Sequence, residues 1–210
     1  MPPGRGCTVA SLIQRAGAPG PADALLKPAS SNGDEGRCEP APAIRRATIA
    51  DIPQVHALIA LNAKTGAVLP RTLENLYTTV REFQVCVDAD TVIGMCALHV
   101  SNSTLAEIRS LCVDDRYEGR GIGSALTQAS INEARRLGLG TVFALTYRVK
   151  FFQRLGFTVV EKSTLPQKIW TDCVHCHKFP TCDETALILR LQETPDQEGA
   201  ASPPLLRVLR

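Results

Sequence analysis

The sequence predicts one α/β domain with a tail at each end. Helical and strand-like patterns alternate along residues 43–192, which is typical of helices packed on a single sheet. The composition is globular: 44% of residues are apolar and 21% are charged. Segments 1–42 and 193–210 are rich in Pro, Gly and Ala and lack sustained periodicity. We therefore expect a disordered N-terminal extension, a folded domain and a flexible C-terminal tail.

Charge and cysteine content narrow the class of protein. A net charge of +2 gives no strong field for nucleic acid or a membrane surface, and no apolar run approaches the ~20 residues that span a bilayer. Of the eight cysteines, Cys86, Cys96 and Cys112 lie inside apolar runs, where a thiol acts as a small hydrophobe. The first thirty residues lack the continuous apolar core of a signal peptide, so we expect a reducing, cytoplasmic location. Basic residues precede the first acid, Asp23, which leaves plastid or mitochondrial import open.

The first half of the domain begins with a strand over 43–49 and a helix that starts near Asp51. Asp51 is a good N-cap, Pro53 suits a first helical turn, and apolar residues follow at helical spacing. A second helix is predicted from Leu73–Val80, where Leu73, Leu76, Tyr77 and Val80 are spaced i, i+3, i+4, i+7.

Strands dominate the next stretch, and short helices separate them further on. Strands are predicted over 83–87 and 91–100, with a turn around Asp88–Asp90. The second half continues with a strand over 105–113, a helix with Ile122, Ala125, Leu126 and Ala129 on one face, a strand over 141–147, a short helix over 149–155 closed by Gly156, and a strand over 185–191.

A glycine-rich loop joins the strand over 105–113 to the helix after it. Glycine lets the backbone approach a ligand closely, and a helix N-terminus offers unpaired N–H groups with partial positive charge. The loop is therefore suited to a pyrophosphate, although a plain turn remains the alternative. The spacing is neither a dinucleotide fingerprint nor a P-loop. The residues concerned are Gly119, Gly121 and Gly123, with Arg116, Arg120 and Ser124 beside them.

The loop resembles motif A of the GNAT-type N-acetyltransferase superfamily, R/Q-x-x-G-x-G/A, over Glu118–Gly123. Glu118 departs from the Arg or Gln usual at the first position. The likeness continues in order through "IRRATIADIPQV", "FFQRLGF" and the strand over 185–191. The segments "LPRTLENLYTTVREF", "LAEIRSL", "ALTY" and "LGF" are most similar to short bacterial N-acetyltransferases related to the acetyltransferase domain of N-acetylglutamate synthase.

This resemblance implies a GNAT-like domain: a mixed, mostly antiparallel sheet whose fourth and fifth strands splay apart to admit acetyl-CoA. It also implies direct acetyl transfer to the α-amine of an amino acid, L-glutamate first, and hence a role in arginine biosynthesis. The expected partners are therefore small molecules, and a homodimer is left open. The expected acetyl-CoA contacts are Leu111, Cys112, Val113, Gly119, Arg120, Gly121, Ile122, Gly123, Ser124 and Phe152.

A general base and an acid are expected for this reaction, because the amine must lose a proton and the departing thiolate must gain one. Some family members place a Glu eleven residues before the first loop position, and Glu107 lies eleven before Glu118. Strand alternation places Arg109 on the same face, so a plain Glu107–Arg109 ion pair is the alternative. The family's usual acid is a Tyr where this chain has Phe152. Tyr147 or water is expected to replace it.

Substrate carboxylates favour Arg, whose planar fork binds them bidentately. Arg71, in a region that the synthases use for substrate, is the first candidate, followed by Arg109 and Arg148. Acidic residues in the pocket would instead favour a protein N-terminus, a lysine or a polyamine as acceptor. A non-catalytic acyl-CoA-binding module is a further alternative, motivated by Glu118 and Phe152.

A cysteine cluster lies just before the last strand. Cys173, Cys176 and Cys182 include a C-x2-C spacing, with two histidines nearby, which is compatible with a structural zinc ion. A loop of reduced cysteines that shapes the substrate side of the cleft is the alternative.

Overall fold

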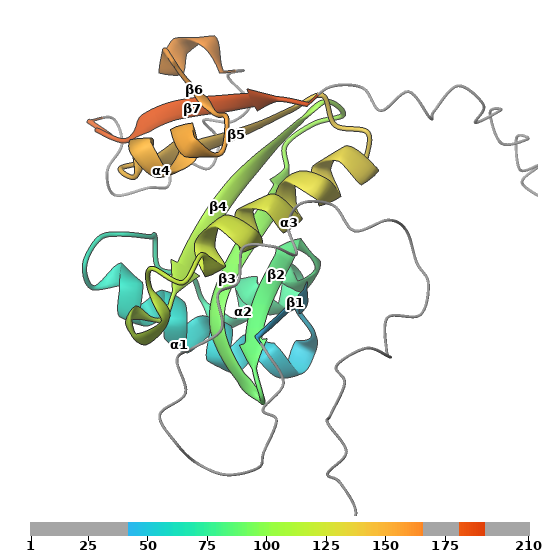
Figure 1. Ribbon diagram of the computed structural model, residues 1–210, viewed down its shortest axis with the longest axis vertical. Helices are drawn as coiled ribbons and strands as arrows, with labels where there is room; N and C mark the ends of the chain where they lie inside the picture. The colour runs from blue at the N-terminus through green and yellow to red at the C-terminus, as the bar shows by residue number, and fades with distance from the viewer. Residues whose placement is uncertain (1–41, 166–180, 192–210) are drawn as a thin grey trace, which may run out of the picture.

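The computed structural model describes residues 42–165 and 181–191, which form one seven-stranded sheet with helices on both faces (Figure 1). The predictions for the two tails, and those for Cys173 and Cys176, fall outside these ranges. No helix in the described part of the chain is long and apolar enough to cross a membrane. The elements are β1 (Ala43–Arg46), α1 (Ile52–Ala63), α2 (Leu73–Thr78), β2 (Phe83–Asp88), β3 (Thr91–Val100), β4 (Leu105–Val113), α3 (Ile122–Arg136), β5 (Thr141–Thr146), α4 (Val149–Arg154), β6 (Thr158–Val160) and β7 (Thr185–Arg190).

The strand order is β1-β2-β3-β4-β5-β7-β6, and every neighbouring pair is antiparallel except β4 and β5. The expected mixed, mostly antiparallel sheet is confirmed. Strand β6 was not predicted: it has only three residues and pairs with β7 alone at the edge.

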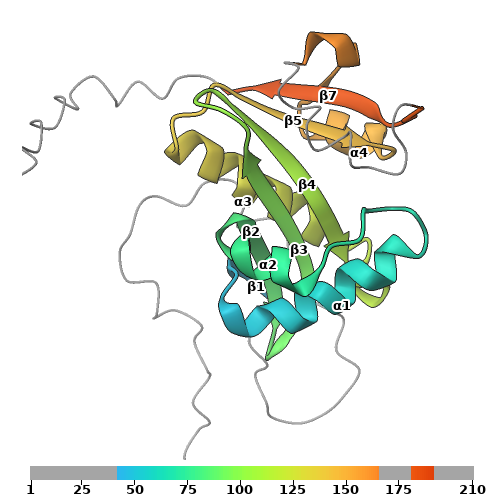
Figure 2. The same cartoon turned by 180° about the vertical axis from the view of Figure 1, so that it is seen from behind.

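Two apolar cores lie on opposite faces of the sheet. Helices α1 and α2 cover one face and α3 crosses the other, as Figures 1 and 2 show from opposite sides. Strand β3 is buried from Val92 to Leu98 because it contributes to both cores. On the α3 side, Ile122 and Leu126 of the predicted apolar face are buried in the core, together with Ile131, which was not predicted.

The start of α1 differs in detail from the prediction. A 3₁₀ turn, Ile49–Asp51, precedes the helix, and Thr48 donates to Asp51 Oδ2 from its backbone N (2.7 Å) and Oγ1 (2.8 Å). Arg45 donates hydrogen bonds to the same carboxylate from both terminal nitrogens, at 2.7 and 2.8 Å. These hydrogen bonds hold the pKa of Asp51 well below its usual range despite burial. Asp51 therefore ties β1 to α1 instead of capping the helix.

Helix α2 is shorter than predicted. Regular α-helix ends at Thr78, and Val80–Glu82 form a separate 3₁₀ turn. Only Leu76 of the proposed apolar stripe is fully buried, while Leu73 and Tyr77 are 42% and 40% exposed. The four residues have helical spacing, but only Leu76 packs into the core.

A β-bulge in β4 alters strand alternation. Cα pairing runs Ala97↔Arg109 and then Met95↔Cys112, so two β4 residues oppose Cys96, and Ser110 has φ 53°. One extra residue reverses the side on which later residues lie. Ile108 packs in the α3 core, whereas Cys112 joins the α1 core on the other face.

Strands β4 and β5 separate soon after they meet. Their pairing covers only Leu105–Glu107 with Thr141–Phe143. Beyond Glu107 the two strands splay, as the resemblance implied, and the gap becomes the wall of a cleft.

Candidate active site

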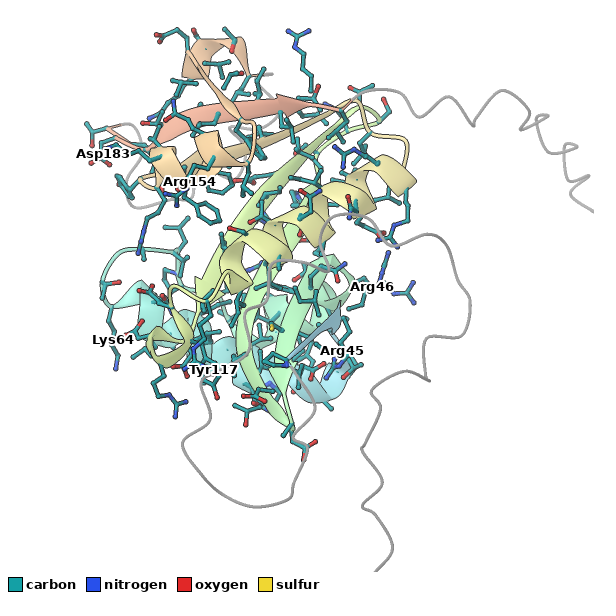
Figure 3. All side chains as sticks on the ribbon, in the orientation of Figure 1. Arg45, Arg46, Lys64, Tyr117, Arg154 and Asp183 are labelled. Atoms are coloured by element: carbon teal, nitrogen blue, oxygen red, sulfur yellow. The ribbon has the colours of Figure 1, made fainter. Side chains whose placement is uncertain are left out.

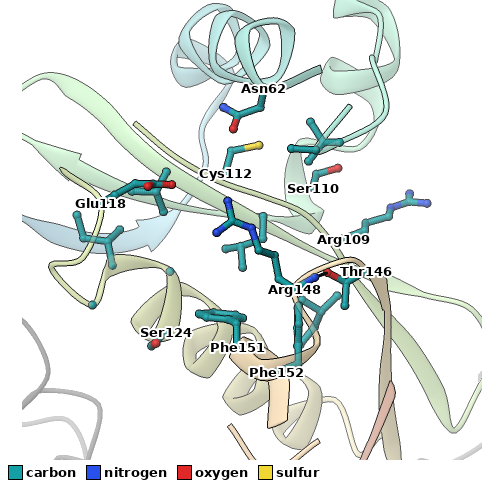
Figure 4. Close-up of a pocket in the computed structure, with 18 of the residues that line it drawn as sticks. Asn62, Arg109, Ser110, Cys112, Glu118, Ser124, Thr146, Arg148, Phe151 and Phe152 are labelled. Carbon is teal, nitrogen blue, oxygen red and sulfur yellow. Dashed lines mark hydrogen bonds between the residues drawn. The ribbon is translucent and has the colours of Figure 1, made fainter. Parts of the chain in front are cut away.

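A cleft of about 470 Å³ opens where β4 and β5 part. Its walls are β4 from Ile108 to Val113, the glycine loop with the start of α3, and the β5–α4 junction (Figure 4). Tyr117 beside the loop and Arg154 on α4 lie on opposite sides of it (Figure 3). Nearly all the predicted acetyl-CoA contacts line this cleft: Leu111, Cys112, Val113, Gly119, Gly121, Ile122, Gly123, Ser124 and Phe152.

The glycine loop has the backbone that a close anion contact needs. Gly119 and Gly121 have φ of 75° and 85°, a region that side-chain-bearing residues rarely adopt. Helix α3 begins directly after Gly121, so the unpaired N–H groups of its first turn face the cleft mouth. The loop can therefore bind a phosphate through main-chain groups, aided by the helix dipole.

The arginines of the loop are largely occupied by the protein. Arg116 binds Asp114 with two nitrogens, at 2.7 and 3.0 Å. Arg120 lies over the Tyr117 ring, 4.8 Å from its centroid, and does not line the cleft, in contrast to the expectation. Tyr117 in turn donates to Asp88 at 3.1 Å, which fixes the loop to the β2–β3 hairpin. Glu118 is exposed at the rim of the cleft (Figure 4).

A cluster of charged residues lies at the opposite end, where the strands part. Glu82 accepts from His99 Nδ1 at 2.9 Å and from Arg109 Nη2 at 3.1 Å. Arg109 Nη1 also lies 3.8 Å from Glu107 Oε2. Burial raises the pKa of Glu82, but the hydrogen bond from His99 and the charge of Arg109 more than offset this and lower it overall.

Glu107 lies at the point where β4 and β5 separate. It is the last β4 residue paired with β5, opposite Phe143, and its side chain is 16% exposed. Its neighbours Ile108 and Arg109 line the cleft. Among the described residues, Glu107 itself does not line the cleft, and it forms the ion pair with Arg109 that the sequence analysis gave as the alternative.

Tyr147, the other predicted catalytic residue, is less favourably placed to act as the general acid. Its side chain is 46% exposed, and its hydroxyl donates to Asp183. The residues on either side of it, Thr146 and Arg148, line the cleft instead. The tyrosine thus connects the end of β5 to the segment before β7.

The three candidate substrate arginines separate into two groups. Arg109 and Arg148 line the cleft, and Arg148 extends into it in Figure 4. Arg71 does not line it: its guanidinium binds Asn75 (2.8 Å) and Thr79 (3.1 Å) and lies 5.3 Å from the centroid of the Phe83 ring. Phe83 pairs with Ala97, which lies on the same face of β3 as His99, so Arg71 adjoins the face that carries the charged cluster.

The lining residues that the sequence analysis did not single out include Asn62, Ser110, Thr146 and Phe151. Ser110 is exposed to the cleft by the bulge, for which the sequence gives no signal. Phe151 is adjacent to the predicted Phe152; it faces Gly123, where an added Cβ would lie 3.7 Å from its ring, while Phe152 is buried beneath. The pair of adjacent phenylalanines was the sequence signal that could have indicated Phe151.

The cysteine cluster can be followed only at Cys182. Its thiol lies 3.8 Å from Glu184 Oε2, and its carbonyl accepts from Lys162 at 2.6 Å. Within residues 42–165 and 181–191, no group of three His, Cys, Asp or Glu side chains is arranged to hold a metal ion.

Comparison with known proteins agrees with this architecture. The model of the acetyltransferase (GNAT) family matches residues 62–157. An uncharacterized N-acetyltransferase of Chlorobaculum tepidum is 37% identical over 148 residues, which is 70% of this chain and 96% of its own. An amino-acid acetyltransferase of Mycobacterium tuberculosis is also 37% identical, over 134 residues, 62% of this chain and 76% of its own.

One similar solved structure contains bound ligands. N-acetylglutamate synthase of Neisseria gonorrhoeae, solved with coenzyme A and N-acetyl-glutamate, is 28% identical with a TM-score of 0.66. The similarity covers 73% of this chain and 36% of the synthase. The chain belongs to the GNAT family of acetyltransferases and is an acetyl-CoA-dependent acyltransferase.

Proposed function

We propose that this protein acetylates the α-amine of an amino acid, with L-glutamate as the first candidate and N-acetylglutamate as the product. One observation supports the proposal: a single cleft runs from the phosphate-suited glycine loop to Arg109, whose guanidinium is paired with Glu107. The names of the mycobacterial and gonococcal relatives support the substrate class. A place in arginine biosynthesis follows if glutamate is the acceptor.

The charge of the cleft favours an anionic acceptor. Among the residues that the structure describes, Arg109, Arg148 and Arg154 line it, against one acidic residue, Glu118, at the far rim. Paired or not, arginine guanidinium groups attract carboxylates and repel the ammonium groups of a polyamine. We propose that Arg109 and Arg148 bind the substrate carboxylates, and that Arg71 contributes from the adjoining face.

Direct transfer is favoured over an acyl-enzyme. Cys112 lines the cleft, but burial raises its pKa to about 12, so its thiol is not a nucleophile near neutral pH. In the proposed mechanism, Glu107 takes a proton from the substrate ammonium, and the free amine attacks the acetyl carbonyl. The C–N bond forms, the C–S bond breaks, and a water molecule protonates the thiolate because the Tyr147 hydroxyl is bound to Asp183.

The decisive experiment measures CoA release from acetyl-CoA across amino acids, polyamines and an N-terminal peptide, with mass spectrometry of the product. We expect L-glutamate to give the highest kcat/KM and an acetyl group on its α-nitrogen. Preference for a polyamine or peptide would reject the amino-acid assignment. Binding of acetyl-CoA without turnover of any amine would support the binding-module alternative.

A further inference from the structure

His99 lies beside Glu107 in the sheet. The two residues are Cα partners in the antiparallel pair of β3 and β4, so their side chains project from the same face. Directly opposed residues have Cβ atoms about 4.5–5.5 Å apart, so the imidazole and the carboxylate are neighbours on that face. The side chain of His99 is 31% exposed, whereas that of Glu107 is 16% exposed. His99 thus has the greater contact with solvent.

Glu82 orients the imidazole ring. Its carboxylate meets His99 Nδ1 at 2.9 Å and is only 21% exposed. An ionised carboxylate accepts a hydrogen bond, so the proton of neutral His99 is drawn to Nδ1 and the lone pair resides on Nε2. This arrangement is how proteins set a histidine to accept a second proton.

The charges around His99 favour such a role. From the 3₁₀ turn before β2 it faces Glu82, and from β4 it faces Glu107 and Arg109. Two of these three described neighbours are carboxylates, which attract a positively charged imidazolium.

We propose that His99 relays the substrate proton: Glu107 takes it from the ammonium and passes it to His99, which releases it to solvent. The inference rests on the proposed function, in which Glu107 is the base. The steps balance: ammonium and carboxylate give amine and carboxylic acid, the acid and imidazole give carboxylate and imidazolium, and imidazolium loses its proton to water. Histidine acts through Glu107 and does not touch the substrate.

The test compares His99→Gln with His56→Gln in the full chain, using CoA release with the best amine from the acceptor panel. Glutamine can donate a hydrogen bond to Glu82 but cannot carry a proton. His56 on α1 takes part in none of the contacts of the cluster. In weak buffer we expect His99→Gln to lower kcat by about tenfold to a hundredfold, with KM within about twofold, and His56→Gln to match the wild type.

Added imidazole supplies the readout that a structural role would not affect. We expect imidazole to restore kcat of His99→Gln in proportion to its unprotonated fraction, and to leave the wild type unchanged. An unchanged kcat, or a lowered kcat that imidazole does not restore, would overturn the relay. If His99→Gln unfolds on circular dichroism, His99→Asn takes its place in the same assay.

The two proposals fail in different ways. A strong loss in Glu107→Gln with no effect of His99→Gln would reject the relay and leave Glu107 as base. No loss in Glu107→Gln would reject the base, and the relay with it. A preferred acceptor other than an amino acid would reject the substrate assignment alone, because the relay is measured on whichever amine is acetylated.

Discussion

The two ends of the cleft are built in different ways. At one end the glycine loop presents backbone N–H groups at the start of a fifteen-residue helix, and its arginines are held by Asp114 and Tyr117. At the other end, side chains from three segments, Glu82, His99 and the β4 pair Glu107 and Arg109, meet through hydrogen bonds and ion pairs.

This difference explains which substitutions each end tolerates. Backbone groups are present whatever the side chain, so the loop accepts Glu118 where relatives in the superfamily carry Arg or Gln. The charged end depends on each side chain, because removal of one partner leaves another charge poorly compensated in a partly buried site. Sequence variation at the loop should therefore alter affinity, and variation at the cluster should alter turnover.

The largest effect is expected for Glu107→Gln. The amide keeps the shape of the side chain but cannot take a proton, so kcat should fall by about 10²-fold or more. Steady-state CoA release measures this, with Glu74→Gln on exposed α2 as a matched control that should behave like the wild type. A Glu107→Gln enzyme with wild-type kcat would mean that the charged end contributes no base.

An intermediate effect is expected for Gly121→Ala. With φ of 85°, an alanine here costs about 1–2 kcal/mol or displaces the loop. We expect KM for acetyl-CoA to rise by roughly tenfold with little change in kcat. The control is Gly140→Ala, where φ is not positive and the nearest atom to an added Cβ is 3.9 Å away. Equal KM in both variants would show that the loop does not bind the cofactor.

The smallest effect is expected for Glu118→Gln. Removal of an exposed negative charge beside a phosphate site should lower KM for acetyl-CoA by about threefold at low ionic strength, and by less as salt screens the charge. Measurement of KM at increasing salt concentrations tests both the decrease in KM and its dependence on ionic strength. A KM that is higher in the variant would mean that Glu118 contacts the ligand favourably, for example through a ribose hydroxyl.

Much of the fold was predictable because it is encoded over short stretches. The glycine loop, the apolar face of α3 and the strands β2 to β5 depend on neighbouring residues, and their predicted ranges agree closely with the structure. Where prediction failed, long-range packing decided. Helix α2 buries only Leu76, and Asp51 joins Arg45 instead of capping α1.

The candidate site also has one part that the sequence predicted and another part that only the tertiary structure shows. The resemblance to the acetyltransferase superfamily and the eleven-residue spacing singled out Glu107 on the strand that leads into the glycine loop, since strand and loop are contiguous in the chain. Only the tertiary structure brought Glu82 and His99 to Glu107, because register between strands is a non-local property. The bulge at Ser110 and the turning of Tyr147 toward Asp183 were likewise decided by packing against other segments, whose contacts no local pattern encodes.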